Sequence, residues 1–111
     1  MDELGLSVGF LAHVRGNVNA NRTGEVILNK NAVIDGDVSI VGAASVDPLH
    51  FEVIVQDITV DGNVLLLNNE PTVVIGADEI GGNLICFGND AVSPFGAIAV
   101  GGQKLGECAN I

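Results

Sequence analysis

Two cysteines and two histidines are the side chains with the widest range of chemistry in this 111-residue sequence. A catalytic thiol needs a histidine base beside it, and a zinc site needs about four ligands. Cys86 and Cys108 have no histidine near them in the sequence, and His13 and His50 stand far apart. These residues therefore predict neither a cysteine nucleophile nor a metal centre, and we expect both histidines to lie on the surface.

Carboxylates form the second group with possible chemistry. Asp35 and Asp61 each precede a glycine in related sequence phrases, and Asp78 and Glu79 are expected in a later turn. Stacked like charges are unfavourable unless a cation neutralises them, so Asp35 and Asp61 are candidate calcium ligands; the alternative is a solvated acidic face. A glycosidase also uses paired carboxylates, but the chain lacks Trp and Tyr for sugar stacking and has no long binding loops. We expect no enzyme activity and no cofactor.

The overall charge limits the partners of the protein. With 14 acidic residues against four Lys and Arg, the net charge is −10. Repulsion from phosphate groups argues against binding to nucleic acid or to an anionic membrane surface. No stretch reaches about 18 consecutive apolar residues, so we expect no membrane insertion, and the first residues lack the pattern of a signal peptide. The triplet NRT makes Asn21 a candidate N-glycosylation site.

One short phrase recurs along the chain and defines its elements. The phrase is an aliphatic residue, any residue, glycine, usually Asn or Asp, and another aliphatic residue, and its copies begin at Val14, Ile34, Val60, Ile80 and Val100. The glycines of these copies are spaced by 20, 26, 20 and 20 residues. Short Val- and Ile-rich strands between Gly and Asn turns, repeated at this period, are typical of a parallel β-solenoid. The sequence thus predicts one all-β domain, a parallel β-helix of about five rungs of ~20 residues.

The boundaries of the parts follow from the repeat. Residues 1–13 are expected to form an N-terminal strand or cap, and residues 14–111 the solenoid. A loop insertion near 43–57 accounts for the longer spacing. We expect an irregular last rung that bulges or peels away, because Lys104 stands at a position that is aliphatic in every earlier rung.

Stacking strands about 4.8 Å apart brings equivalent residues of successive rungs into columns. Three aliphatic columns are expected to face inward: Val14, Ile34, Val60, Ile80 and Val100; Val18, Val38, Val64 and Leu84; and Ala20, Ile40, Leu66 and Cys86. A polar column lies between the first two and contains Asn17, Asp37, Asn63 and Asn83. Stacked amides can hydrogen-bond along the axis, so we interpret this column as a structural polar ladder rather than an exposed ridge for glycan or ice.

Two segments resemble known β-helical proteins. NAVIDGDVSIVG, residues 31–42, resembles a rung of the bactofilins, which are short polymer-forming β-helices. Residues 80–109, which contain IGGNLICFGND and VGGQKLGECA, are similar to the C-terminal signature of small secreted bacterial β-helical proteins of unassigned function. These resemblances imply a right-handed parallel β-helix and an extracellular or cell-surface location.

The two cysteines have a structural interpretation within this repeat. Cys86 lies in an inward aliphatic column, and Cys108 falls two positions out of register with it in the next rung. If the last rung folds back across the open end, the two residues come within disulfide range. Two cysteines in a small, secreted-looking β fold favour this pairing, so we expect a Cys86–Cys108 disulfide.

The ends of a solenoid expose strand edges and core side chains unless they are capped or stacked. No polar cap is evident here, because an apolar strand with Leu4, Leu6, Val8 and Phe10 stands at one end and the chain closes at Ile111. We therefore expect a non-enzymatic structural protein, an extracellular β-helix that self-associates as a homo-oligomer or polymer of the filament or surface-layer type. The alternative is a surface binding or adhesin module that recognises a glycan or a protein through the 43–57 insertion. An enzyme fragment is a third hypothesis.

Overall fold

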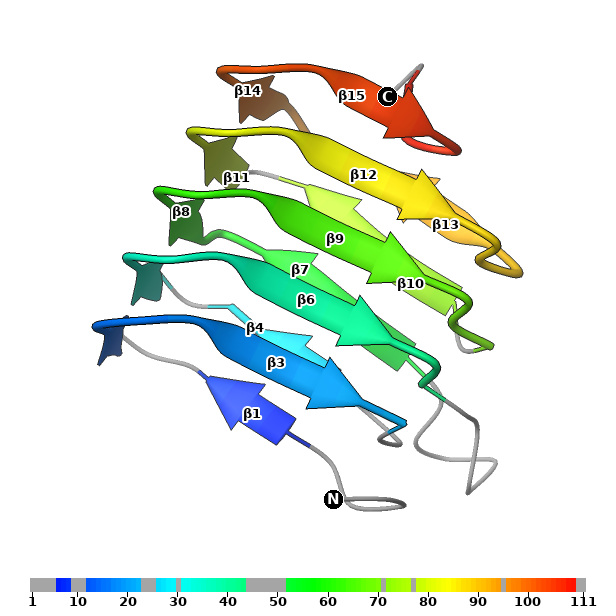
Figure 1. Ribbon diagram of the computed structural model, residues 1–111, viewed down its shortest axis with the longest axis horizontal. Helices are drawn as coiled ribbons and strands as arrows, with labels where there is room; N and C mark the ends of the chain where they lie inside the picture. The colour runs from blue at the N-terminus through cyan, green and yellow to red at the C-terminus, as the bar shows by residue number, and fades with distance from the viewer. Residues whose placement is uncertain are drawn as a thin grey trace.

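The computed structural model describes residues 6–8, 12–22, 26–29, 31–43, 52–70, 72–76, 78–94 and 96–109. These residues form fifteen strands and no helix, so this part of the chain contains no helix able to span a membrane. The strands build three five-stranded parallel sheets. Within each sheet, the chain makes about four turns between the first strand and the last (Figure 1). The protein is a parallel β-solenoid, as its repeat predicts.

Each rung of the solenoid consists of three consecutive strands, one from each sheet. Sheet A contains β1 (Leu6–Val8), β4 (Val26–Leu28), β7 (Glu52–Gln56), β10 (Thr72–Gly76) and β13 (Val92–Pro94). Sheet B contains β2 (His13–Val14), β5 (Val33–Ile34), β8 (Thr59–Val60), β11 (Asp78–Ile80) and β14 (Ile98–Val100). Sheet C contains β3 (Val18–Asn21), β6 (Val38–Val41), β9 (Val64–Leu67), β12 (Leu84–Phe87) and β15 (Lys104–Gly106). In Figure 1 sheet C lies in front and runs to the right while the chain rises from its N-terminus, so the coil is right-handed.

The core is a stack of aliphatic layers. The three columns predicted to face inward are in register through sheets B and C, since each member pairs with its equivalent in the next rung. Sheet A adds two inward columns, which contain Val26, Val53 and Val73, and Leu28, Val55 and Ile75. These side chains are fully buried in the middle rungs. Parallel pairing therefore places similar aliphatic side chains in direct contact along the axis.

The residues of the predicted polar ladder lie at the turn between sheets B and C. The sequence predicts hydrogen bonds between their side chains, but most of their hydrogen bonds are to backbone N–H groups. Asn17, Asp37, Asn63 and Asn83 each use Oδ1 to accept the backbone N–H of the equivalent residue in the next rung, at 2.7–2.8 Å. A contact between two ladder side chains occurs where Asn63 Nδ2 donates to Asp37 Oδ1 at 3.4 Å. Each oxygen satisfies a backbone donor at the turn, which is why an aspartate can replace an asparagine in this column.

The glycine before each ladder residue is required for space. At Gly36, Gly62, Gly82 and Gly102, a Cβ atom would collide with the ladder Oδ1 of the preceding rung and lie 2.7–2.9 Å from the carbonyl oxygen of the preceding glycine. None of these four glycines has a positive φ, so the close approach of the rungs is the constraint. Gly16 stands in the first rung, and nothing lies within 4 Å of a Cβ placed there.

Gly62→Ala and Gly16→Ala form a matched pair that tests this constraint. We expect Gly62→Ala to lower the free energy of unfolding by about 1–3 kcal/mol, because the added methyl group overpacks the turn. Gly16→Ala should leave the free energy of unfolding unchanged or raise it slightly, since the site is open and alanine lowers the entropy of the unfolded chain. Urea unfolding followed by circular dichroism measures both values. Equal losses in the two variants would contradict the steric explanation.

The last rung is more regular than the sequence predicts. β15 pairs with β12 residue for residue, from Leu84 with Lys104 to Cys86 with Gly106, so this strand continues the column without a bulge. Backbone hydrogen bonds hold Lys104 in the strand even though its side chain replaces an aliphatic one. The chain leaves the register only after Gly106, whose φ of 71° is in the left-handed region.

Two other segments differ in detail from the expected boundaries. Residues 6–8 form the expected strand, β1, which pairs with β4 as the first strand of sheet A and so belongs to the first rung. The end of the 43–57 range forms β7, a regular member of sheet A. Residues 44–51, which hold most of the insertion, lie outside the described residues.

Candidate functional site

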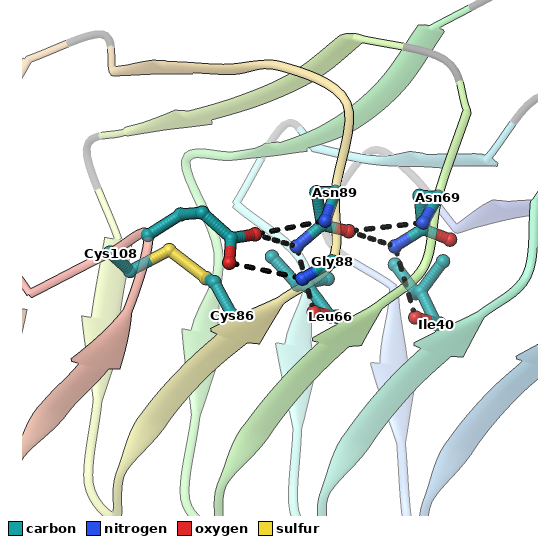
Figure 2. Close-up of a disulfide and its surroundings, with 8 residues drawn as sticks. Ile40, Leu66, Asn69, Cys86, Gly88, Asn89 and Cys108 are labelled. Carbon is teal, nitrogen blue, oxygen red and sulfur yellow. Dashed lines mark hydrogen bonds between the residues drawn. A yellow bond between two sulfur atoms is a disulfide. The ribbon is translucent and has the colours of Figure 1, made fainter.

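A disulfide between Cys86 and Cys108 closes one corner at the C-terminal end of the solenoid (Figure 2). The two Cα atoms are 5.5 Å apart, and both side chains are fully buried. Gly106 occupies the column position next to Cys86, and a Cβ there would collide with the Cys86 carbonyl oxygen. The positive φ of Gly106 lets the chain turn at residues 107–109, which returns Cys108 to the core beside Cys86.

A second polar ladder follows sheet C at the same corner, and the repeat phrase does not reveal it. Asn69 is fully buried, and its Nδ2 donates to the Ile40 carbonyl at 3.2 Å and to Asn89 Oδ1 at 2.8 Å. Asn89 Nδ2 donates in turn to the Leu66 carbonyl at 2.9 Å. The amides therefore satisfy carbonyl groups where the chain leaves sheet C in successive rungs (Figure 2).

Glu107 ends this second ladder, beside the disulfide. Its carboxylate accepts the N–H of Gly88 at 3.0 Å, the N–H of Asn89 at 2.9 Å and the Asn89 side-chain amide at 2.9 Å. Burial alone would raise the pKa of Glu107, but the hydrogen bonds from Asn89 and Gly88 outweigh it and lower the pKa from its ordinary value. The final turn is therefore held by a covalent bond at Cys108 and by charge-assisted hydrogen bonds at the preceding residue.

Asp78 is a buried carboxyl in β11, although the sequence suggested a solvated turn. It pairs with Ile98 of the next rung, and its Oδ1 accepts the N–H of Ile58 at 3.1 Å, while Oδ2 has no hydrogen-bond partner. The pKa of Asp78 is raised to about 7, mainly by burial and also by the Asp57 carboxylate, while hydrogen bonds from Ile58 and Gly76 act to lower it. This carboxyl changes charge near neutral pH from a position that is closed to external substrates.

The two aspartates considered for calcium lie at the start of the turns between sheets B and C. Asp35 Oδ1 is 2.9 Å from His13 Nε2, and both side chains are exposed. Asp61 is also exposed. Within the described part of the chain, no three His, Cys, Asp or Glu side chains gather as metal ligands would. Asp35 thus has a histidine partner, which the sequence predictions did not include.

The outer face of sheet C becomes apolar toward the C-terminal end. One outward column changes from Asn19 and Ser39 to Leu65, Ile85 and Leu105, and the other ends at Phe87. Phe87 is 49% exposed and Leu105 is 37% exposed. These outward strand residues carry no charge, so this face could pack against an apolar surface without burying an ion.

Among the described strands, the first and the last of each sheet pair on one side only. The strands β1, β2 and β3 pair only with strands of the second rung, and β13, β14 and β15 pair only with strands of the fourth rung. Val14, Val92, Ile98 and Val100 are only partly buried, whereas equivalent residues of the middle rungs are buried. The described ends therefore present strand edges and incompletely covered core residues.

The other predicted site residues are distributed as follows. Asn21 ends β3 and is exposed, and Thr23 of its glycosylation triplet lies outside the described residues. Leu6 and Val8 lie in β1. Leu4, Phe10 and Ile111, which are expected at the assembly ends, lie outside the described ranges. So do Leu49, His50 and Phe51, which would lead the contact if the 43–57 insertion binds a glycan or a protein.

No known family, curated protein or solved structure matches this sequence. Sequence reasoning missed the second ladder and the buried carboxyl, although each carries a signal. Asn69 and Asn89 stand 20 residues apart, which is the repeat period, and Asp78 occupies the column of Ala32 and Ile58. Comparison of every repeat position, rather than of the glycine phrase alone, reveals both.

Proposed function

We propose that this chain is a non-enzymatic structural protein, an extracellular β-solenoid subunit that associates with copies of itself into a filament or a surface layer. The Cys86–Cys108 pair supports a location in an oxidising environment, where disulfides persist. The likeness of residues 80–109 to small secreted bacterial β-helical proteins, and of residues 31–42 to a bactofilin rung, supports the same proposal. The proposed partner is the chain itself, without nucleic acid or membrane insertion.

The open strand edges at both ends carry this proposal. Backbone N–H and C=O groups at an unpaired edge bond readily to another strand, and natural proteins usually cover or blunt such edges. Here the first and last described strands of all three sheets pair on one side only. Partly buried aliphatic residues lie beside these edges, so pairing with another copy would also bury apolar surface.

The state of the reactive side chains supports a structural role. Cys86 and Cys108 are joined and buried, His13 contacts Asp35, and Asp78 is enclosed in the core. A nucleophile or general base must reach a substrate, and the cysteines and Asp78 are inaccessible. Cys86, Cys108 and Asp78 therefore contribute to the fold rather than to a reaction at the surface.

Self-association can be measured directly on the oxidised chain. We expect the mass from light scattering and sedimentation velocity to rise with protein concentration, and electron microscopy to show extended assemblies at the highest concentrations. Added salt should strengthen association, because it screens the repulsion between chains of net charge −10. A constant mass of one chain at every concentration and salt level would refute the proposal; glycan binding by such a monomer would favour the adhesin alternative.

A further inference from the structure

The contact between successive rungs is the same at each of four turns. The N–H of each ladder glycine donates to the carbonyl of the glycine in the preceding rung, at 2.8–3.0 Å, from Gly36 to Gly102. The N–H of the next residue donates to the ladder Oδ1 of the preceding rung at 2.7–2.8 Å. At these two positions each rung accepts from the next rung and donates to the rung before it, so this contact has a direction.

The two ends of the solenoid carry the complementary halves of this contact. The first rung has Gly16 and Asn17, whose equivalents in later rungs donate N–H groups to the rung before them. The last rung has Gly102 and Gln103, whose equivalents in earlier rungs accept these bonds through a glycine carbonyl and a side-chain oxygen. Gln103 is exposed and also has an amide oxygen, one methylene further from the backbone than that of asparagine.

Gly16 provides the steric observation. In every later rung the glycine is required because the rung before it leaves no space for a Cβ, but at Gly16 nothing lies within 4 Å. Its φ is not positive, so backbone conformation does not demand glycine either. If a rung of another copy packed against Gly16, it would leave no space for a Cβ there. The preceding rung has this effect at Gly36 and Gly62 within the chain.

The charges at the two ends are complementary. Arg15 and Arg22, two of the four Lys and Arg residues, lie exposed in the first rung. Arg22 follows β3 at the corner after sheet C, and Glu107 follows β15 at the same corner of the last rung. Stacking the first rung of one copy on the last rung of another would bring Arg22 to the corner that holds Glu107, which is favourable in a chain that is otherwise acidic.

Lys104 limits the strength of this contact. It stands in the column of Val18 and Leu84, so a stacked copy would place its Val18 against the Lys104 stem. The stem can pack on an aliphatic residue, and inward-pointing lysines weaken pairing at sheet edges. The contact is therefore expected to be reversible rather than permanent.

We propose that copies of this chain dock head to tail, with β1, β2 and β3 of one copy pairing in parallel with β13, β14 and β15 of another (Figure 1). The inference rests on the proposed self-association and specifies its surfaces and polarity. Such a contact is heterologous, since different surfaces meet, and it continues the solenoid from one copy to the next.

Cysteine trapping tests the polarity. Asn19 and Leu105 belong to one outward column of sheet C and are exposed, so Asn19→Cys and Leu105→Cys should leave the core intact. Head-to-tail docking places position 19 of one copy one strand spacing from position 105 of another, within disulfide range. A mixture of the two variants should form the mixed dimer on oxidation, and either variant alone should not crosslink. Self-crosslinking of Leu105→Cys without the mixed dimer would overturn the proposal in favour of packing between apolar faces of sheet C.

Gly16→Ala is the second test, because its fold is expected to match the parent. We expect this variant to retain its unfolding free energy and to lose association by roughly tenfold or more in sedimentation velocity. The control variant Phe87→Ser, on the apolar outer face, should associate like the parent. Unchanged association of Gly16→Ala, with weakened association of Phe87→Ser, would reject end docking and leave self-association standing. A parent chain that never associates would reject both proposals.

Discussion

Asp78→Asn should raise the free energy of unfolding at pH 7 and leave it nearly unchanged at pH 4. In the parent, Asp78 is buried in the column of Ile98, with one oxygen bonded to the Ile58 N–H and the other without a partner. Asparagine keeps an acceptor for Ile58 and cannot ionise. The variant should therefore behave at every pH like the parent with Asp78 protonated.

The sign follows from the raised pKa of this group. Burial raises the pKa of Asp78 from 3.8 to about 7, so the folded chain holds a proton that the unfolded chain has released over this range. Below about pH 4, Asp78 therefore does not lower the free energy of unfolding of the parent. Its ionisation lowers this free energy as the pH rises toward 7 and has no further effect above that pH. At about 1.4 kcal/mol for each unit, the loss is on the order of 4 kcal/mol.

Urea unfolding between pH 4 and pH 8 measures this effect. The curve of unfolding free energy against pH should be flatter for Asp78→Asn than for the parent, and the two should converge near pH 4. Asp61→Asn is the matched control, because it makes the same substitution at an exposed carboxylate near sheet B. Parallel curves for the parent and Asp78→Asn would show that Asp78 is ionised in the folded chain without cost.

Reduction of the Cys86–Cys108 disulfide should lower the free energy of unfolding by about 3 kcal/mol, because the crosslink restricts a loop with a sequence separation of 22 in the unfolded chain. The loss should fall mainly on the last rung. β15 pairs with β12 alone, and each rung of a solenoid is stabilised by its neighbours. Without the covalent bond, the Glu107 hydrogen bonds to Gly88 and Asn89 are the main restraint on the final turn.

Urea unfolding with and without a phosphine reductant gives the size of the effect, and hydrogen exchange of residues 104–109 gives its location. Both cysteines are fully buried, so reduction should be slow in the folded chain and fast once urea opens it. The double variant Cys86→Ala/Cys108→Ala is the control, since reductant should not change its unfolding. Equal midpoints for oxidised and fully reduced parent would contradict a stabilising crosslink.

The repeat could be predicted from sequence because a parallel solenoid places residues one period apart in direct contact. Gly36, Gly62 and Gly82 are visible as a periodic phrase since each must leave room for the rung before it. The inward columns follow from the same period and from the alternation of side chains along a strand. The repeat period and the residue types are therefore enough to predict the fold class, the inward columns and the proximity of the two cysteines.

Only the tertiary structure decided how the individual positions are satisfied. Asp78 stands three residues before the glycine pair of its rung and is typical of a turn residue, but it lies in β11 and is buried in the core column. Asn69 likewise reads as a surface turn residue, and it is buried because the Ile40 carbonyl and Asn89 need its amide. The closure at Cys108 depends on the left-handed conformation of Gly106. The other rungs have a left-handed residue two positions later, at Arg22, Gly42, Asn68 and Gly88, and the period does not predict this shift. Contacts that recur in every rung can be predicted from the repeat. Contacts that form at one place only depend on where the folded solenoid brings each backbone group.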